Sequence, residues 1–228
     1  MRKIILIFFV ISNFILFAHT VQAGVHGKGF NTRNNQAFCS FFGVITHIDV
    51  QNLDANLKSG CTSLSIDSPG GEVSAALLMG RLIRKYQIDV QTTVDGKCAS
   101  ACVFLFAAGV SRIAFGPVEI HRPYIIDSSA SFEKTQDVYR VLEQKIKKFL
   151  RDMNVNESLY EAMMSISPEE SKKLSLREIY DFGMLPTDPV HDEFLENRKA
   201  TLLGFSKVEW LIKKRHAANF HESGRRPG

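Results

Sequence analysis

The chain has 228 residues, of which 45% are hydrophobic and 23% charged, and a formal net charge of +4 at neutral pH. So weak a positive charge does not indicate a protein that binds nucleic acid, and we expect no such partner. The residues that follow the N-terminal leader, 24–228, suit one domain that is large enough to bury a full core.

The first 23 residues have the features of a secretory signal peptide. Arg2 and Lys3 precede the apolar run IILIFFVISNFILF, and the small residues VQA end at Ala23. We expect cleavage after Ala23 and a periplasmic or secreted mature protein, with retention as an uncleaved anchor left open. Because the leader holds two basic residues and no acidic one, its removal lowers the net charge from +4 to +2.

Four cysteines lie beyond the leader, at Cys39, Cys61, Cys98 and Cys102. An exported protein meets an oxidising compartment, so we expect one or two disulfides, although sequence alone leaves three complete pairings open. The cysteines lack the spacing of a zinc site and no HExxH pattern occurs, so we expect no metal and no cofactor.

Strand and helix patterns alternate along the chain after a polar lead-in over 24–36. Strands are expected at 41–50, 61–66, 89–94 and 118–123, and helices at 50–60, 73–85 and 100–109. The helix over 73–85 is amphipathic, with its apolar face at Val73, Ala76, Leu77, Gly80 and Ile83. This alternation favours an α/β fold with a mainly parallel sheet.

A long amphipathic helix is expected over 132–151. Its apolar stripe consists of Val138, Val141, Leu142, Ile146 and Phe149 on a helix otherwise rich in Lys, Glu and Gln. Such a helix covers the domain or meets a partner subunit. The basic tail, 206–228, is expected to form a packed terminal helix with a frayed end; contact with an anionic membrane surface is the alternative.

Three features fall at strand ends, where the loops of an α/β sheet usually build a site. They are the turn IDSPGG with Gly70 and Gly71, the serine of CASAC at Ser100, and His121 in VEIHRP. Glycines leave backbone N–H groups free to point at an anion, and a serine nucleophile needs a histidine base and oxyanion donors. Taken singly, each feature is also consistent with a structural role.

The order of these segments, IDSPGGEV, then CASACVFLFAAG, then VEIHRP, resembles the proteolytic subunit of the Clp protease and its relatives in the Clp/crotonase superfamily. The likeness extends over roughly 41–185 and includes LSLREIYDFGML. It implies a spiral of repeated β-β-α units with a mainly parallel sheet and a long protruding helix, in one domain with a core at about 38–190.

The resemblance implies a role for each matching residue. Ser100 would be the nucleophile and His121 the general base. Gly70, Gly71 and Ala101 would form the oxyanion hole, with the N–H groups of Gly71 and Ala101 as its donors. The helix that opens at Ser100 would add its positive end.

The third catalytic member departs from the family pattern. The family has an aspartate ahead of the LS that opens its late helix, and Ser171 stands at this position. Glu170 is the slightly favoured substitute, with Glu169 and Asp188 as other candidates. Without a group that orients His121, the site would be a weakened Ser–His dyad, or the protein would be an inactive enzyme that only binds its ligand.

The cysteines that flank Ser100 are not explained by the family. In a helical segment Cys98 and Cys102 would lie within disulfide range, and a bridge would clamp the turn of the nucleophile. The alternative is that both thiols are unpaired and only fill space in the core. If the two are bridged, Cys39–Cys61 is the natural second pair.

We therefore expect an exported, ATP-independent serine hydrolase, a peptidase that acts on short or unfolded chains. No P-loop pattern occurs in the sequence. A homo-oligomer built through the long helix is expected. The alternative is a weak or inactive peptide-binding module on the same fold; a crotonase-like enzyme acting on acyl thioesters fits poorly.

Overall fold

The computed structural model describes residues 24–31, 36–124 and 132–223. The expected signal peptide, 1–23, lies outside the described residues.

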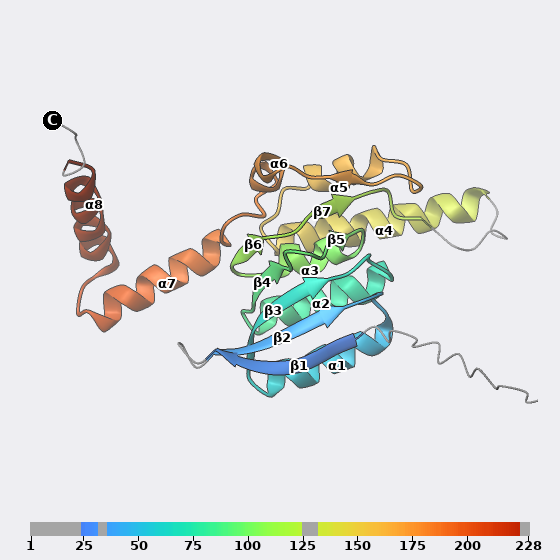
Figure 1. Ribbon diagram of the computed structural model, residues 1–228. Helices are drawn as coiled ribbons and strands as arrows, with labels where there is room; N and C mark the ends of the chain where they lie inside the picture. Colours follow the sequence, from blue (N-terminus) through green and yellow to red (C-terminus); the bar gives the residue numbers. More distant parts are fainter. Residues whose placement is uncertain (1–23, 32–35, 125–131, 224–228) are drawn as a thin grey trace, which may run out of the picture.

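The larger of two sheets has five strands in the order β1-β2-β3-β4-β6. They are β1 (Gly24–Asn31), β2 (Gln36–Phe42), β3 (Cys61–Asp67), β4 (Asp89–Thr92) and β6 (Arg112–Ala114). All neighbours pair in parallel except β1, which runs antiparallel to β2 at the edge (Figure 1). The expected α/β class and mainly parallel sheet are confirmed.

A small second sheet carries the candidate catalytic residues. In it β7 (Val118–Ile120) lies between β5 (Cys98–Ala99), with which it pairs in parallel, and β8 (Lys172–Lys173), with which it pairs antiparallel. An isolated bridge between Ser68 and Cys98 links the end of β3 to this sheet. The carboxyl ends of β3, β5 and β7 are thereby brought to one edge.

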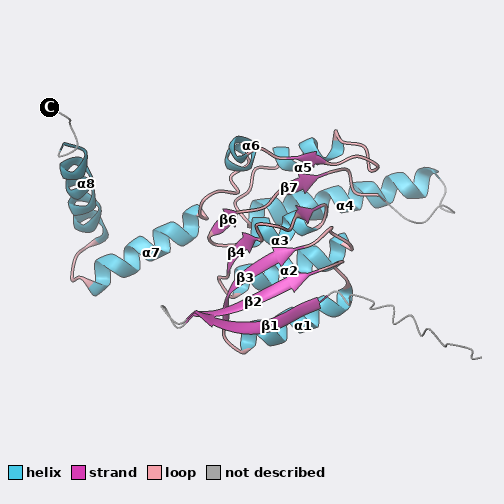
Figure 2. Ribbon diagram, viewed as in Figure 1, coloured by secondary structure: helices cyan, strands magenta, loops and turns pink. Residues whose placement is uncertain are grey.

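Helices make up most of the rest of the described chain, as Figure 2 shows. They are α1 (His47–Lys58), α2 (Val73–Lys85), α3 (Cys102–Ala108), α4 (Phe132–Asp152), α5 (Ser158–Met164), α6 (Leu176–Asp181), α7 (Pro189–Leu202) and α8 (Lys207–Ser223). Every residue of α3 is buried, so this helix forms the centre of the core. Its Phe104 meets Phe149 of α4 edge to face, with ring centroids 5.8 Å apart.

Two expected elements near the N-terminus are wrong. The strand expected over 41–50 ends at Phe42, and helix α1 begins at His47. The buried Asp49 carboxylate accepts hydrogen bonds from the Thr46 N–H and hydroxyl, both at 2.8 Å, which fixes the start of the helix. The lead-in over 24–36 instead contains β1, which is held by main-chain pairing that side-chain patterns do not reveal.

The two ends of α4 have different surroundings. Ile146 and Phe149 are fully buried, whereas Val138 and Val141 are exposed. The C-terminal half of the expected apolar stripe thus packs on the core, and the N-terminal half is uncovered.

The C-terminal residues form two helices that leave the body of the molecule (Figure 1). Helix α8 packs against α7, where Trp210 donates to Glu196 and Lys207 pairs with Glu193. Several apolar side chains on both helices are exposed, among them Phe194, Leu202, Val208 and Ile212. The tail therefore packs on α7 rather than on the core. No helix in the described ranges is long and apolar enough to cross a membrane.

Candidate active site

The SPGG turn joins the two sheets through a buried serine. Ser68 Oγ donates to the Gly43 carbonyl at 2.6 Å and accepts from the Gly70 N–H at 3.1 Å. The Ser68 carbonyl accepts from the Ala99 N–H at 3.0 Å. The turn is thus fixed directly against the strand that leads into Ser100.

Gly70 and Gly71 both have backbone conformations that favour glycine, with φ of +101° and +145°. A Cβ on Gly70 would stand 2.6 Å from Ser100 Cβ and 3.0 Å from the Ala101 nitrogen. A Cβ on Gly71 would stand 2.3 Å from the Ile45 carbonyl oxygen. A glycine at position 70 thus allows the turn to approach Ser100 closely, and a glycine at position 71 allows it to approach Ile45.

Ser100 lies between β5 and α3 with a φ of +56°, which is uncommon for a residue other than glycine. Its N–H donates to the Glu119 carbonyl at 3.0 Å, continuing the parallel pairing of β5 with β7. The residue is half-buried. A residue in this strained conformation between a strand and a helix is held there by the surrounding contacts.

Two backbone N–H groups beside Ser100 are free to bind an anion. Within the described ranges, the N–H groups of Gly71 and Ala101 have no hydrogen-bond partner, whereas that of Gly70 is taken by Ser68 Oγ. Unpaired donors near a serine hydroxyl are what an oxyanion hole requires. Gly70 accordingly provides close approach rather than a donor.

His121 follows β7, next to the strand that leads to Ser100. Its Nδ1 lies 2.8 Å from the Arg122 carbonyl oxygen, and its ring stacks on Tyr124 with centroids 6.2 Å apart. The parallel register brings Ser100 and His121 to adjacent strand ends. No hydrogen bond between their side chains is present in the described part of the chain.

The register of β7 with β8 aligns Ser171 with His121. Ile120 pairs with Lys172, so Ser171 is the next residue in the ladder opposite His121. The Ser171 hydroxyl donates to Glu119 Oε2 at 3.3 Å. Glu119 and His121 share one face of β7 because they are two residues apart. Sequence reasoning missed Glu119, which this alternation in VEIHRP could have revealed.

Within the described residues, the carboxylates considered as a third member make no hydrogen bond to His121. Glu169 accepts from the Ser167 hydroxyl, and Glu170 is exposed with no side-chain hydrogen bond in the described residues.

Asp188 is buried, with its carboxylate 2.8 Å from Arg84 and 3.7 Å from Arg112, and it caps α7. Burial alone would raise the pKa of Asp188, but Asn154 and Arg84 hold it below its usual value. None of these contacts involves His121.

The structure contains two disulfides, Cys39–Cys61 and Cys98–Cys102. The second encloses Ser100, and both of its sulfurs belong to fully buried residues. The first connects the neighbouring parallel strands β2 and β3. The bridge expected across the turn that contains Ser100 is thus present.

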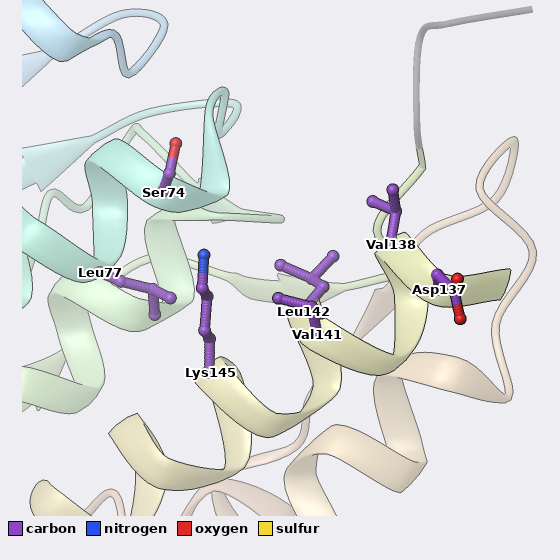
Figure 3. Close-up of a pocket in the computed structure, with 7 residues that line it drawn as sticks. All are labelled: Ser74, Leu77, Asp137, Val138, Val141, Leu142 and Lys145. Carbon is purple, nitrogen blue, oxygen red and sulfur yellow. The ribbon is translucent and has the colours of Figure 1, made fainter. Parts of the chain in front are cut away.

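An apolar pocket of about 350 Å³ lies between α2 and α4 (Figure 3). Ser74, Leu77 and Lys145 line it together with the exposed part of the α4 stripe. Because Ser74 is only three residues beyond Gly71, the pocket adjoins the SPGG turn. Among the described residues, no group of three or more His, Cys, Asp or Glu side chains could hold a metal ion.

Two comparisons relate this chain to known proteins, and the match to a family model agrees with the resemblance seen in the motifs. One similar solved structure is a serine-to-alanine mutant of the 1510-N membrane-bound stomatin-specific protease, with 18% identity and a TM-score of 0.48; the match covers 64% of this chain and 75% of that one. The family model for Clp protease matches residues 46–179, more than half of the chain and including Ser100, His121 and Ser171. The chain therefore belongs to the Clp protease family.

Proposed function

We propose that this protein is an exported, ATP-independent serine peptidase. Ser100 attacks the carbonyl carbon of a peptide bond, and His121 accepts the proton of the hydroxyl and returns it to the leaving amine. The N–H groups of Gly71 and Ala101 bind the oxyanion of the tetrahedral intermediate. Water then attacks the acyl-enzyme. His121 accepts a proton from this water and returns it to Ser100 as the acyl group leaves.

One observation carries this proposal: a serine at positive φ, packed against Gly70 and flanked by two unpaired N–H groups. A serine in an ordinary helix start would need neither the strained backbone nor the paired glycines. Each oxyanion donor in such a site contributes about 3 kcal/mol to transition-state stabilisation.

Export is part of the same proposal. The leader over 1–23 and the two disulfides support a mature protein in an oxidising compartment. An exported protein does not meet cytosolic ATP or an unfolding partner in that compartment, so the substrates are short or already unfolded peptides. A second part of the proposal is assembly of copies through α4, supported by its exposed valines.

The test is labelling of the purified mature protein by a fluorophosphonate, in parallel for wild type, Ser100→Ala and Ser165→Ala. Ser165 is an exposed serine on the C-terminal end of α5 and serves as the matched control. We expect wild type and Ser165→Ala to be labelled and Ser100→Ala to be unlabelled, with cleavage of a fluorogenic peptide following the same order.

The other candidate function is a peptide-binding module without catalysis. It is favoured by one observation, the hydroxyl of Ser171 in register with His121 where the family has a carboxylate. A folded wild-type protein that binds extended peptides by strand addition but takes no label would establish this function instead.

A further inference from the structure

A hydrogen-bond acceptor lies next to the ring of His121, but that acceptor is not a side chain. Nδ1 of His121 lies 2.8 Å from the backbone oxygen of Arg122. Within the described residues no carboxylate contacts the ring, and Ser171 directs its hydroxyl to Glu119. The orienting position is thus occupied by a main-chain carbonyl.

A carbonyl oxygen can only accept a hydrogen bond, so Nδ1 must carry the proton of the neutral ring. Nε2 then bears the lone pair. This is the tautomer that a general base needs, because the base receives the serine proton at Nε2 while Nδ1 remains protonated.

The Arg122 carbonyl is held in place from several directions. The Arg122 N–H donates to the Ile166 carbonyl at 3.1 Å, and its Nε donates to the Met164 carbonyl at 3.0 Å. Both acceptors lie at the end of α5. Pro123 follows directly, and a residue before proline is restricted to extended conformations, which limits the direction of its carbonyl.

The next peptide is anchored to a second helix. The Tyr139 hydroxyl on α4 donates to the Pro123 carbonyl at 3.0 Å. Tyr124 then stacks on the His121 ring at an interplanar angle of 25°. The segment His121–Tyr124 is therefore fixed to α5 and to α4, and it covers one face of the ring.

We propose that the Arg122 backbone carbonyl, held by α5 and α4, performs the positioning role that an aspartate performs elsewhere in the family. The inference rests on the proposed function, since it assigns the group that orients the base. It explains how a site with Ser171 in place of the aspartate keeps a usable histidine. It also assigns no catalytic part to Glu169 or Glu170.

The test is the tautomer of His121, read by long-range proton–nitrogen NMR on histidine-labelled mature protein at a pH where the ring is neutral. The His121 signals are assigned from their loss in His121→Gln. We expect a proton on Nδ1 and none on Nε2 in wild type, with no change in Glu169→Gln and Glu170→Gln.

Two variants release the carbonyl from different sides. Arg122→Ala removes the hydrogen bond to Met164, and Tyr139→Phe removes the one to Pro123. In each we expect a mixture of tautomers and labelling of Ser100 slowed roughly fivefold, the effect of one hydrogen bond. Tyr139→Phe changes a single hydroxyl, so it keeps the test valid if Arg122→Ala does not fold.

The tautomer of His121 tests the role of the carbonyl, and the labelling of Ser100 tests the peptidase. A wild-type ring protonated at Nε2, or a tautomer that shifts in Glu170→Gln or Glu119→Gln, would overturn the role of the carbonyl, whether or not Ser100 is labelled. An Nδ1-protonated ring in a protein that takes no fluorophosphonate would leave the positioning intact and refute the peptidase.

Discussion

Single residues determine how closely the SPGG turn approaches Ser100. Gly60 and Gly70 have nearly the same φ, +97° and +101°, but a Cβ on Gly60 meets nothing within 4 Å. A substitution at Gly60 therefore reports the cost of the backbone conformation alone. The difference in effect between substitutions at Gly70 and at Gly60 therefore measures the contribution of the contact with Ser100.

We expect Gly60→Ala to lower the free energy of unfolding by about 1–2 kcal/mol, the cost of a left-handed conformation, and to leave fluorophosphonate labelling unchanged. Gly70→Ala should cost more and abolish labelling, because its Cβ would displace Ser100. Urea denaturation and the labelling rate measure the two effects. Equal behaviour of the two variants would contradict the close approach.

The carboxylate of Asp188 compensates the charge of the fully buried Arg112. Burial lowers the pKa of Arg112 to about 10, which still leaves it charged at neutral pH. Asp188→Ala should therefore cost about 3–5 kcal/mol of unfolding free energy. Asp188→Asn, which keeps a cap for α7, should cost less.

The same carboxylate makes stability depend on pH. Because the pKa of Asp188 is lowered in the folded protein, its contribution is present above the pKa of the unfolded chain, about 3.9, and is lost as pH falls through the folded value. Wild type should therefore lose more stability than Asp188→Asn in acid. Parallel losses measured by thermal unfolding would contradict this role.

The two disulfides act on different properties of the fold. Cys39–Cys61 closes a loop with a sequence separation of 22, and replacing both cysteines by alanine should cost about 3 kcal/mol of unfolding free energy. Labelling of Ser100 should persist, since this bridge lies between β2 and β3.

The double alanine variant of Cys98 and Cys102 should show the opposite pattern. Its short loop restricts few residues of the unfolded chain, so stability falls less, whereas the turn that holds Ser100 at positive φ is released. We expect slower labelling in a protein that still unfolds cooperatively. Unchanged labelling would show that the glycine turn alone positions the serine.

Patterns in the sequence predicted the elements whose burial follows a clear period. Helix α2 lies where apolar periodicity placed it, and strand β3 lies where a short β-rich run before the turn DSPGG placed it. The motifs placed Ser100 and His121 at strand ends. Strands β5 and β8 have two residues each, too few for any periodicity. The Arg122 carbonyl could not be predicted, because a main-chain acceptor carries no residue signature.

One of the uncovered apolar surfaces of the molecule lies on the N-terminal half of α4. Val138 and Val141 are 44% and 47% exposed and line the apolar pocket beside Leu77 (Figure 3). Lys145 and Asp137 stand at the same pocket, so it offers an apolar centre with a charge of each sign. A self-complementary contact between two copies of α4 would bury these valines.

We expect the mature protein to be oligomeric in sedimentation velocity and Val138→Lys/Val141→Lys to be a folded monomer, because desolvating two lysines in an apolar contact is unfavourable. Ile48→Lys is the matched control, since Ile48 is an exposed apolar residue, 72% accessible, in the first turn of α1. If Ile48→Lys dissociates the oligomer and the α4 variant does not, the interface involves α1. A wild type that sediments as a monomer at all concentrations would contradict assembly through α4.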